Sequence, residues 1–166
     1  ENYGTVEDLL QHCEMIVFWS SNPEATSGNY GSHEGSIRRQ WLKEVDVDFV
    51  HIDPFYNDTA QMLGGKWLAP KPQTDPALAL AIAYVWMTED LYDKDYVLKR
   101  TEGFDKWQAY VLGEDDGIAK TPEWQAEETG VAAKEVRALA RAWGNKKVYL
   151  SAGGAGNGKR RKMSKD

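Results

Sequence analysis

The stretch VDFVHIDPFYNDTA, residues 47–60, decides the fold. Its first six residues form a largely apolar run of strand length, which stops at Asp53-Pro54 and leads into a short polar loop over 55–59. In open α/β sheets, ligands lie beyond the carboxyl ends of the strands. The stretch therefore predicts a buried strand and makes Asp53 a candidate ligand contact.

The neighbouring stretches predict a parallel sheet around this strand. EMIVFWS, residues 14–20, is an uninterrupted apolar run, which is typical of a parallel strand covered on both faces. IRRQWLKEV, residues 37–45, places apolar side chains on one helix face, so that strand, helix and strand make a βαβ unit. A short third strand is expected at 66–70, KWLAP.

The second half of the chain is predicted to be mostly helical. PALALAIAYVWMTED, residues 76–90, is apolar all round, with Asp75 as its expected N-cap. Further helical stretches follow between 93 and 143, and KVYLSAGG, 147–154, is expected to be the last strand. Strands that alternate with helices favour a doubly wound α/β fold with a mostly parallel sheet and a flanking helical layer at about 90–143.

The charge of the chain argues against nucleic acid as a partner. The net charge is −6, and the terminal GKRRKMSKD contributes five basic residues and one acidic residue. Without that tail, 15 basic and 25 acidic residues remain, a net charge of −10 that should repel polyanions. The tail, 157–166, is expected to be disordered or non-native.

Other compositional features exclude several classes of protein. The one cysteine, Cys13, excludes a disulfide framework and a cysteine metal cluster. No apolar run approaches the roughly 18 residues that span a bilayer, so no membrane partner is expected, and a cytoplasmic location is predicted. The three histidines have no metal-site spacing, and no catalytic or metal-binding residue is predicted. The chain does not begin with Met and is expected to be a piece of a larger protein.

Three loops are predicted to meet at the carboxyl edge of the sheet. They span 19–28, 53–59 and 71–75, and offer hydroxyls, amides, backbone N–H groups and two acids, Asp53 and Asp75. This set suits a nucleotide, because N–H groups and hydroxyls bind phosphates and a carboxylate accepts from ribose or a base. The same residues also suit ordinary turns and helix caps, which stays an alternative.

A second glycine-rich stretch does not predict a phosphate-binding loop. GGAGNGKR, residues 153–160, follows a strand and nearly fits the pattern G-x-x-x-x-G-K-[ST]. Arg160 replaces the hydroxyl residue that would bind Mg²⁺, and only six residues follow it.

Read together, four blocks resemble the dimethyl sulfoxide reductase family of molybdopterin enzymes. They are MIVFWSSNPEATSG (15–28), VDFVHIDPFYNDTA (47–60), KWLAPKPQTDPALALAIAYVWMTEDLYDKDYV (66–97) and the stretch from 113 to 154. RRQWLK (38–43) and EVRALAR (135–141) are most similar to large subunits that transfer hydroxyl groups between polyhydroxylated aromatics. The resemblance covers 1–156 in unbroken order.

The resemblance implies a cofactor and a set of contacts. Such enzymes carry a bis(molybdopterin guanine dinucleotide) cofactor with molybdenum or tungsten, and 1–156 would be the α/β domain that holds its guanine dinucleotide end. Trp19, Ser20, Ser21 and Asn22 match the loop beside the pyrophosphate and pterin. Asp53 and Pro54 match the nucleoside contact, and Gln73, Thr74 and Asp75 match the loop at the guanine.

The resemblance also implies the parent activity and partners. The parent reaction would be oxygen-atom or hydroxyl transfer, and the metal ligand and substrate pocket would lie elsewhere, so this chain alone is expected to be inactive. The implied partners are the remaining domains of a large subunit and an iron–sulfur small subunit. Two other hypotheses stay open: a dehydrogenase-type nucleotide-binding domain, although G-x-G-x-x-G is absent after the first strand, and a non-catalytic interaction module.

Overall fold

The computed structural model describes residues 9, 11–26, 37 and 39–152. The chain divides into two compact units, a sheet unit formed by 1–69 and 147–166 and a helical unit formed by 70–146. The helical unit is therefore an insertion between the third and fourth strands of the sheet unit. The basic tail and the glycine-rich stretch from 153 onward lie outside the described residues.

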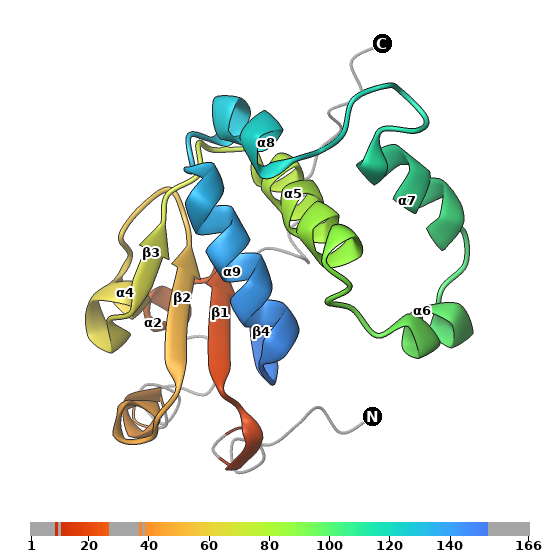
Figure 1. Ribbon diagram of the computed structural model, residues 1–166. Coiled ribbons are helices and arrows are strands. Elements are labelled where there is room, and N and C mark those ends of the chain that lie inside the picture. Colours follow the sequence, from red (N-terminus) through yellow and green to blue (C-terminus); the bar gives the residue numbers. More distant parts are fainter. Residues whose placement is uncertain (1–8, 10, 27–36, 38, 153–166) are drawn as a thin grey trace. The chain divides into compact units, whose positions relative to one another are not determined.

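The sheet unit contains four parallel strands (Figure 1). They are β1 (Met15–Trp19), β2 (Asp48–Ile52), β3 (Lys66–Leu68) and β4 (Val148–Ala152), in the order β3-β2-β1-β4. The chain moves outward from β1 in one direction through β2 and β3 and then returns to the other side of β1. This reversal is the strand order of a doubly wound fold, and the predicted α/β class with a parallel sheet is confirmed.

Short helices connect these strands. They are α2 (Pro23–Thr26), the 3₁₀ helix η1 (Leu42–Glu44) and α4 (Asp58–Leu63). Residues 9, 11 and 12 are helical, and so are 37 and 39–41, as the pattern at 37–45 predicts. The helix α4 was not predicted. Asn57 caps it by accepting a hydrogen bond from the backbone N–H of Ala60 at 3.0 Å.

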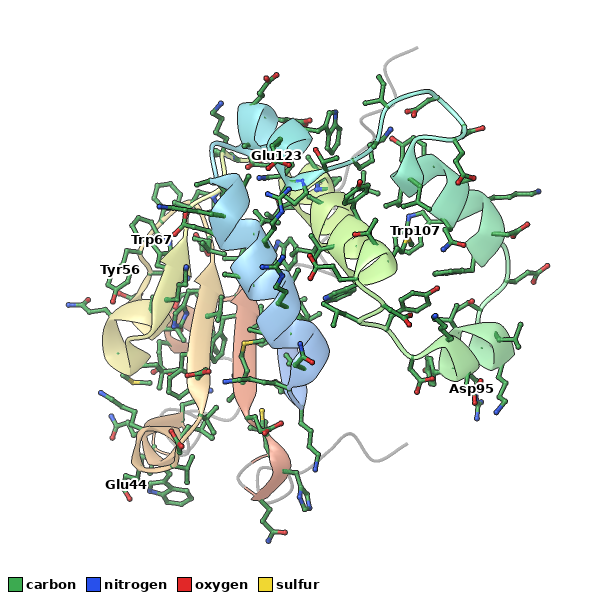
Figure 2. All side chains as sticks on the ribbon, viewed as in Figure 1. Glu44, Tyr56, Trp67, Asp95, Trp107 and Glu123 are labelled. Carbon is green, nitrogen blue, oxygen red and sulfur yellow. The ribbon has the colours of Figure 1, made fainter. Side chains whose placement is uncertain are left out.

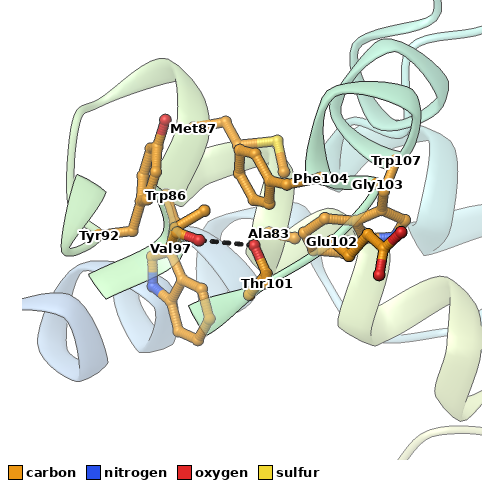
Figure 3. Close-up of a pocket in the computed structure, with 10 residues that line it drawn as sticks. All are labelled: Ala83, Trp86, Met87, Tyr92, Val97, Thr101, Glu102, Gly103, Phe104 and Trp107. Atoms are coloured by element: carbon orange, nitrogen blue, oxygen red, sulfur yellow. Dashed lines mark hydrogen bonds between the residues drawn. The ribbon is translucent and has the colours of Figure 1, made fainter. Parts of the chain in front are cut away.

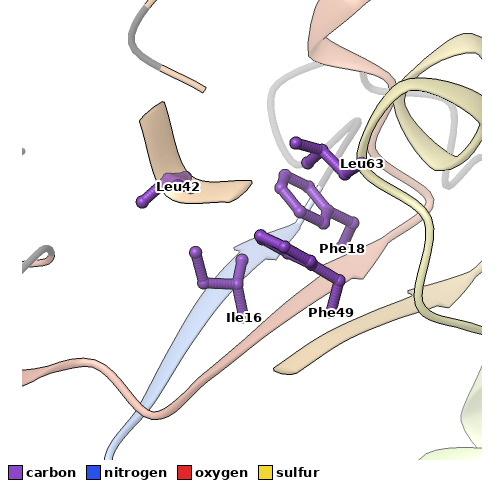
Figure 4. Packing of buried hydrophobic residues seen from close by; sticks show 5 residues of the cluster. All are labelled: Ile16, Phe18, Leu42, Phe49 and Leu63. Atoms are coloured by element: carbon purple, nitrogen blue, oxygen red, sulfur yellow. The ribbon is translucent and has the colours of Figure 1, made fainter. Parts of the chain in front are cut away.

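One face of the sheet unit is closed by a small apolar cluster (Figure 4). The cluster forms because alternate residues of β1 and β2 point to the same face, where the connecting helices cover them. Cys13 packs against it as a partly buried residue. The buried members are Ile16, Phe18, Leu42, Phe49 and Leu63.

The helical unit contains five helices, of which α5 packs against α7, α8 and α9. The bounds are α5 (Asp75–Thr88), α6 (Lys94–Arg100), α7 (Phe104–Leu112), α8 (Pro122–Thr129) and α9 (Ala133–Asn145).

The starts of α8 and α5 differ in how they follow the capping rules. Thr121 caps α8 by accepting a hydrogen bond from the Trp124 backbone N–H, and Pro122 occupies its first turn. The prediction of Asp75 as the N-cap of α5 is wrong by one residue. The helix already begins at Asp75, and Thr74 occupies the cap position without a side-chain cap bond, because its hydroxyl donates to the Lys71 carbonyl at 2.7 Å.

Candidate functional site at the carboxyl edge of the sheet

The strand register brings the ends of β1 and β2 to one edge of the sheet. Trp19 pairs with Ile52, and the backbone pairing continues one step further, because Ser20 N donates to Ile52 O at 2.8 Å. Asp53 N likewise donates to Leu68 O at 3.1 Å. Ser20 and Asp53 therefore leave the sheet at the same level, which is the arrangement that the sequence predicts for these two residues.

Asp53 is held in a fixed orientation by its own turn. Its Oδ1 accepts a hydrogen bond from the Phe55 backbone N–H at 2.9 Å, and its Oδ2 accepts one from Asn57 Nδ2 at 3.1 Å. An ionised carboxylate has about four lone-pair sites. One donor on each oxygen therefore leaves further acceptor capacity on both. Asp53 is a preorganised acceptor for a pair of neighbouring hydroxyl or N–H donors.

The loop after β1 is tied to α4. Asn22 Oδ1 accepts from the hydroxyl of Thr59 at 2.8 Å and from its backbone N–H at 3.3 Å. The hydroxyls of Ser21 and Ser151 lie 2.9 Å apart and share a hydrogen bond. Trp19, at the end of β1, is partly buried. The predicted loop 19–22 is thus anchored on the strands and the helix that flank it.

Two of the predicted site residues have a left-handed backbone. Ser20 has φ +47° and Gln73 has φ +70°, and the only other non-glycine residue with positive φ among those described is Asp90. Such conformations are uncommon outside glycine and gather at functional sites. In both loops the chain turns sharply directly after leaving a strand or before entering a helix.

The predicted loop 71–75 belongs to the helical unit. Lys71 N donates to Thr129 O at 2.9 Å, which fixes the start of the loop on the end of α8. Gln73 is exposed, and Thr74 and Asp75 are partly buried. The carboxylate of Asp75 lies in the first turn of α5. The predicted contact residues thus belong to two units: 19–22, 53 and 54 to the sheet unit, and 73–75 to the helical unit.

Three exposed aromatic side chains accompany Asp53, and sequence reasoning did not single them out. Phe55, Tyr56 and Trp67 are 75%, 50% and 40% exposed. The rings of Tyr56 and Trp67 meet edge to face with centroids 5.4 Å apart (Figure 2). Trp67 Nε1 donates to the backbone oxygen of Asp53 at 2.8 Å. In the sequence, the signal is that Phe55 and Tyr56 come almost directly after Asp53, the acid that follows β2.

His51 is a buried histidine beneath this edge. Its ring stacks on Phe18, and its Nε2 lies 2.9 Å from the backbone oxygen of Gly64. Burial lowers the pKa of His51 below its ordinary value, while the Gly64 carbonyl and the negative charge of Asp53 oppose that shift. Its Nδ1 is buried without a hydrogen-bond partner. His51 is therefore an interior, hydrogen-bonded residue.

The helical unit has a separate cavity of about 400 Å³ (Figure 3). Its walls come from α5, α6 and α7 and the connections between them, and they are mainly apolar and aromatic. Trp86, Tyr92, Phe104 and Trp107 supply the rings, and Glu102 supplies a carboxylate. Thr101 Oγ1 is already bonded to the Val97 carbonyl at 2.7 Å. The lining offers no nucleophile and general base in contact.

Two kinds of feature are absent from the described part of the chain. Among these residues, no group of three or more His, Cys, Asp or Glu side chains is placed to hold a metal ion. No described helix is both long enough and apolar enough to cross a membrane.

Comparisons with known proteins extend over nearly the whole chain. The family model described as molybdopterin oxidoreductase matches residues 4–157. The pyrogallol hydroxytransferase large subunit of Pelobacter acidigallici is 57% identical over 156 residues, 94% of this chain and 18% of that protein. The dimethyl sulfoxide/trimethylamine N-oxide reductase of Rhodobacter capsulatus is 37% identical over 151 residues, 87% of this chain and 18% of that protein.

A solved structure shares the fold. Acetylene hydratase from Pelobacter acetylenicus superimposes with a TM-score of 0.66 and 24% identity, over 85% of this chain and 18% of that one. The chain thus spans about a fifth of the length of the relatives that it matches.

Proposed function

Since the chain belongs to the molybdopterin oxidoreductase family, we propose that it binds the guanine dinucleotide end of a pterin cofactor at the carboxyl edge of its sheet. The resemblance to this family, and to transhydroxylase large subunits within it, is confirmed by the matches to residues 4–157 and to a pyrogallol hydroxytransferase. The observation that carries the proposal is the Asp53 carboxylate, fixed by Phe55 and Asn57 beside the end of β1.

The donors and acceptors at this edge fit a nucleotide. Asp53 keeps lone pairs for ribose hydroxyls or a base N–H, and Pro54 shapes the turn behind it. Trp19, Ser20, Ser21 and Asn22 would lie along the pyrophosphate and pterin. No lysine or arginine occurs in 19–28 or 53–59, so any phosphate contacts from these loops would be neutral hydrogen bonds.

The helical unit contributes a second part of the proposal. Gln73, Thr74 and Asp75 would recognise the guanine, because its N1–H and N2 amine are adjacent donors that one carboxylate accepts together. In this proposal residues 1–156 act as one cofactor-binding domain. The support for this part is the family resemblance and the left-handed turn at Gln73.

The activity of the whole protein is proposed from its relatives. The cofactor, in its bis(molybdopterin guanine dinucleotide) form, would supply the molybdenum or tungsten at which oxygen-atom or hydroxyl transfer takes place. The 57% identical pyrogallol hydroxytransferase favours a polyhydroxylated aromatic as substrate. The remaining domains of a large subunit and an iron–sulfur small subunit would be its partners. The family match favours this function over a dehydrogenase-type domain or a non-catalytic interaction module.

A thermal-shift titration with GDP tests the proposal, with ADP and NAD as comparison ligands. At a hundredfold excess over Kd, a ligand that binds only the folded chain stabilises it by ~2.7 kcal/mol, a rise of about 5–10 °C in Tm for a chain of this size. We expect this rise with GDP, and a much smaller one in Asp53→Asn and Asp75→Asn.

Asp48→Asn is the matched control, because Asp48 is an exposed acid at the opposite, amino end of β2. It should respond to GDP like the wild type. A shift with NAD but not with GDP would contradict the proposal, and so would an unchanged GDP response in both acid variants.

A further inference from the structure

We propose that Phe55, Tyr56 and Trp67 form an aromatic platform on which the planar base of the bound nucleotide stacks. The inference rests on the proposed function and deepens it. It assigns the residues that contact the flat face of the base, whereas the proposed function assigns those that bind its hydrogen-bonding edge. All three residues belong to the sheet unit, so the platform does not depend on how the two units are placed.

Two of the three rings, those of Trp67 and Tyr56, are oriented before any ligand arrives. The indole N–H of Trp67 is bonded to the backbone of Asp53, and its ring is held by the edge-to-face contact with Tyr56. The hydroxyl of Tyr56 donates to the Ala60 carbonyl in α4 at 3.1 Å. Rings that are oriented by such contacts and yet remain 40% to 50% exposed lose little conformational freedom when a ligand stacks on them.

The carboxylate and two of the rings, those of Phe55 and Tyr56, belong to one turn. Phe55 donates its backbone N–H to Asp53 Oδ1, while its own ring, at 75% exposure, is the most exposed of the three. Trp67 reaches the same residue from β3. A ligand that donates hydrogen bonds to Asp53 is therefore beside aromatic surface on both chain segments.

This combination suits a nucleoside better than an apolar protein surface. An apolar partner that covered the rings would also desolvate the Asp53 carboxylate and leave its remaining lone pairs unfilled, which is unfavourable. A nucleoside brings a planar face for the rings together with ribose hydroxyls or base N–H donors for the carboxylate. Stacking is tolerant of base identity, because every base has a π-face.

The test measures Kd for GDP and for ADP by isothermal titration calorimetry in three variants. Phe55→Ala and Trp67→Leu should each weaken both ligands by about tenfold, the usual effect of removing one stacked ring. Trp41→Leu is the matched control, because Trp41 is also half-exposed in the sheet unit but precedes β2 rather than following it. It should leave both Kd values unchanged.

The results distinguish a failure of the aromatic platform from a failure of the proposed nucleotide site. If GDP binding is lost in Asp53→Asn but unchanged in Phe55→Ala and Trp67→Leu, the platform is wrong and the proposed function stands. If the wild type binds neither nucleotide, both are overturned. If Trp67→Leu does not fold, Phe55→Ala still tests the platform, because the exposed Phe55 ring can be removed while its backbone bond to Asp53 remains.

Discussion

At the scale of single residues, Asp53 directly follows the last residue of β2. Its side chain starts the next turn by accepting a hydrogen bond from the Phe55 backbone N–H. The sequence predicts this position well, because an acid followed by proline directly after an apolar run has few alternatives. The left-handed backbone of Ser20 is different, since nothing about a serine predicts positive φ. Ser20 also pairs its backbone N–H with Ile52 O, a contact between residues far apart in the chain that local sequence does not contain.

His51 provides a prediction about pH at this scale. Its pKa is lowered in the folded chain, mainly by burial, so the unfolded chain takes up a proton more readily. Stability should therefore fall as the pH drops below the unfolded value of about 6.5, by at most ~1.4 kcal/mol per pH unit for one proton. In His51→Gln, urea unfolding between about pH 7.5 and about pH 5.5 should show a smaller pH slope.

The control for this measurement is His12→Gln, because His12 is exposed. Comparison of the two variants shows whether the change in slope belongs to the buried ring of His51. Equal slopes in the wild type and His51→Gln would show that His51 is not the group responsible.

At the scale of elements, the helix α4 links the fold to the candidate site. Its cap residue Asn57 uses both ends of its amide, since Oδ1 accepts from Ala60 N and Nδ2 donates to Asp53. Thr59, in the first turn of α4, is bonded to Asn22 of the loop after β1. One short helix therefore positions the acidic turn and the loop on the neighbouring strand.

The two bonds of Asn57 can be separated by substitution. Asn57→Ala removes both, and should lower the free energy of unfolding by about 1 kcal/mol through the lost cap and weaken GDP binding. Asn57→Ser keeps a capping oxygen but is too short to reach Asp53. It should therefore unfold within ~0.5 kcal/mol of the wild type and still bind GDP about fivefold more weakly, the effect of one lost hydrogen bond.

Urea unfolding and calorimetric titration of the same samples would measure both effects. Wild-type GDP affinity in the serine variant would show that the Asn57–Asp53 bond does not orient the carboxylate for the ligand.

Element by element, sequence patterns predict the strands better than the short helices. The four predicted strands match β1 to β4 within two residues at each end. The clearest signals are those of β1 and β2, because buried parallel strands are largely apolar runs. The helix α4 is not predicted, and its first two residues fall in the predicted loop 55–59, since Asn57 and Asp58 are turn formers as well as helix starters. The aromatic platform was also missed, because composition does not tell a core ring from a surface ring.

At the scale of the whole molecule, the division into two units is the feature that sequence patterns do not contain. The apolar periodicity of α9 and the all-round apolar surface of α5 show that these helices are buried, but not which compact unit they belong to. The net charge is a property that the sequence does determine. At −6, the chain as a whole repels anions, and a nucleotide must bind against that field.

This charge predicts an unusual response to salt. GDP is an anion and the loops 19–28 and 53–59 carry no basic residue, so added salt should screen a repulsion rather than an attraction. Between about 20 mM and about 200 mM NaCl, the Kd for GDP should stay constant or improve by up to about twofold. A Kd that weakens severalfold would instead show that lysine or arginine side chains contact the phosphates.

Because the helical unit is inserted between β3 and β4, the ribosome makes β4 long after β1, the strand with which β4 pairs. One edge of β1 can pair with β2 after a short stretch of chain. The other edge pairs with β4, which follows roughly a hundred residues later, about 5–20 s at ordinary elongation rates. During that interval β1 exposes an unpaired row of backbone N–H and C=O groups along an apolar strand, which is the template for pairing with another nascent chain. Slow elongation through 70–146 would lengthen that exposure, so codon choice in the helical unit would influence the yield of a sheet to which it contributes no strand.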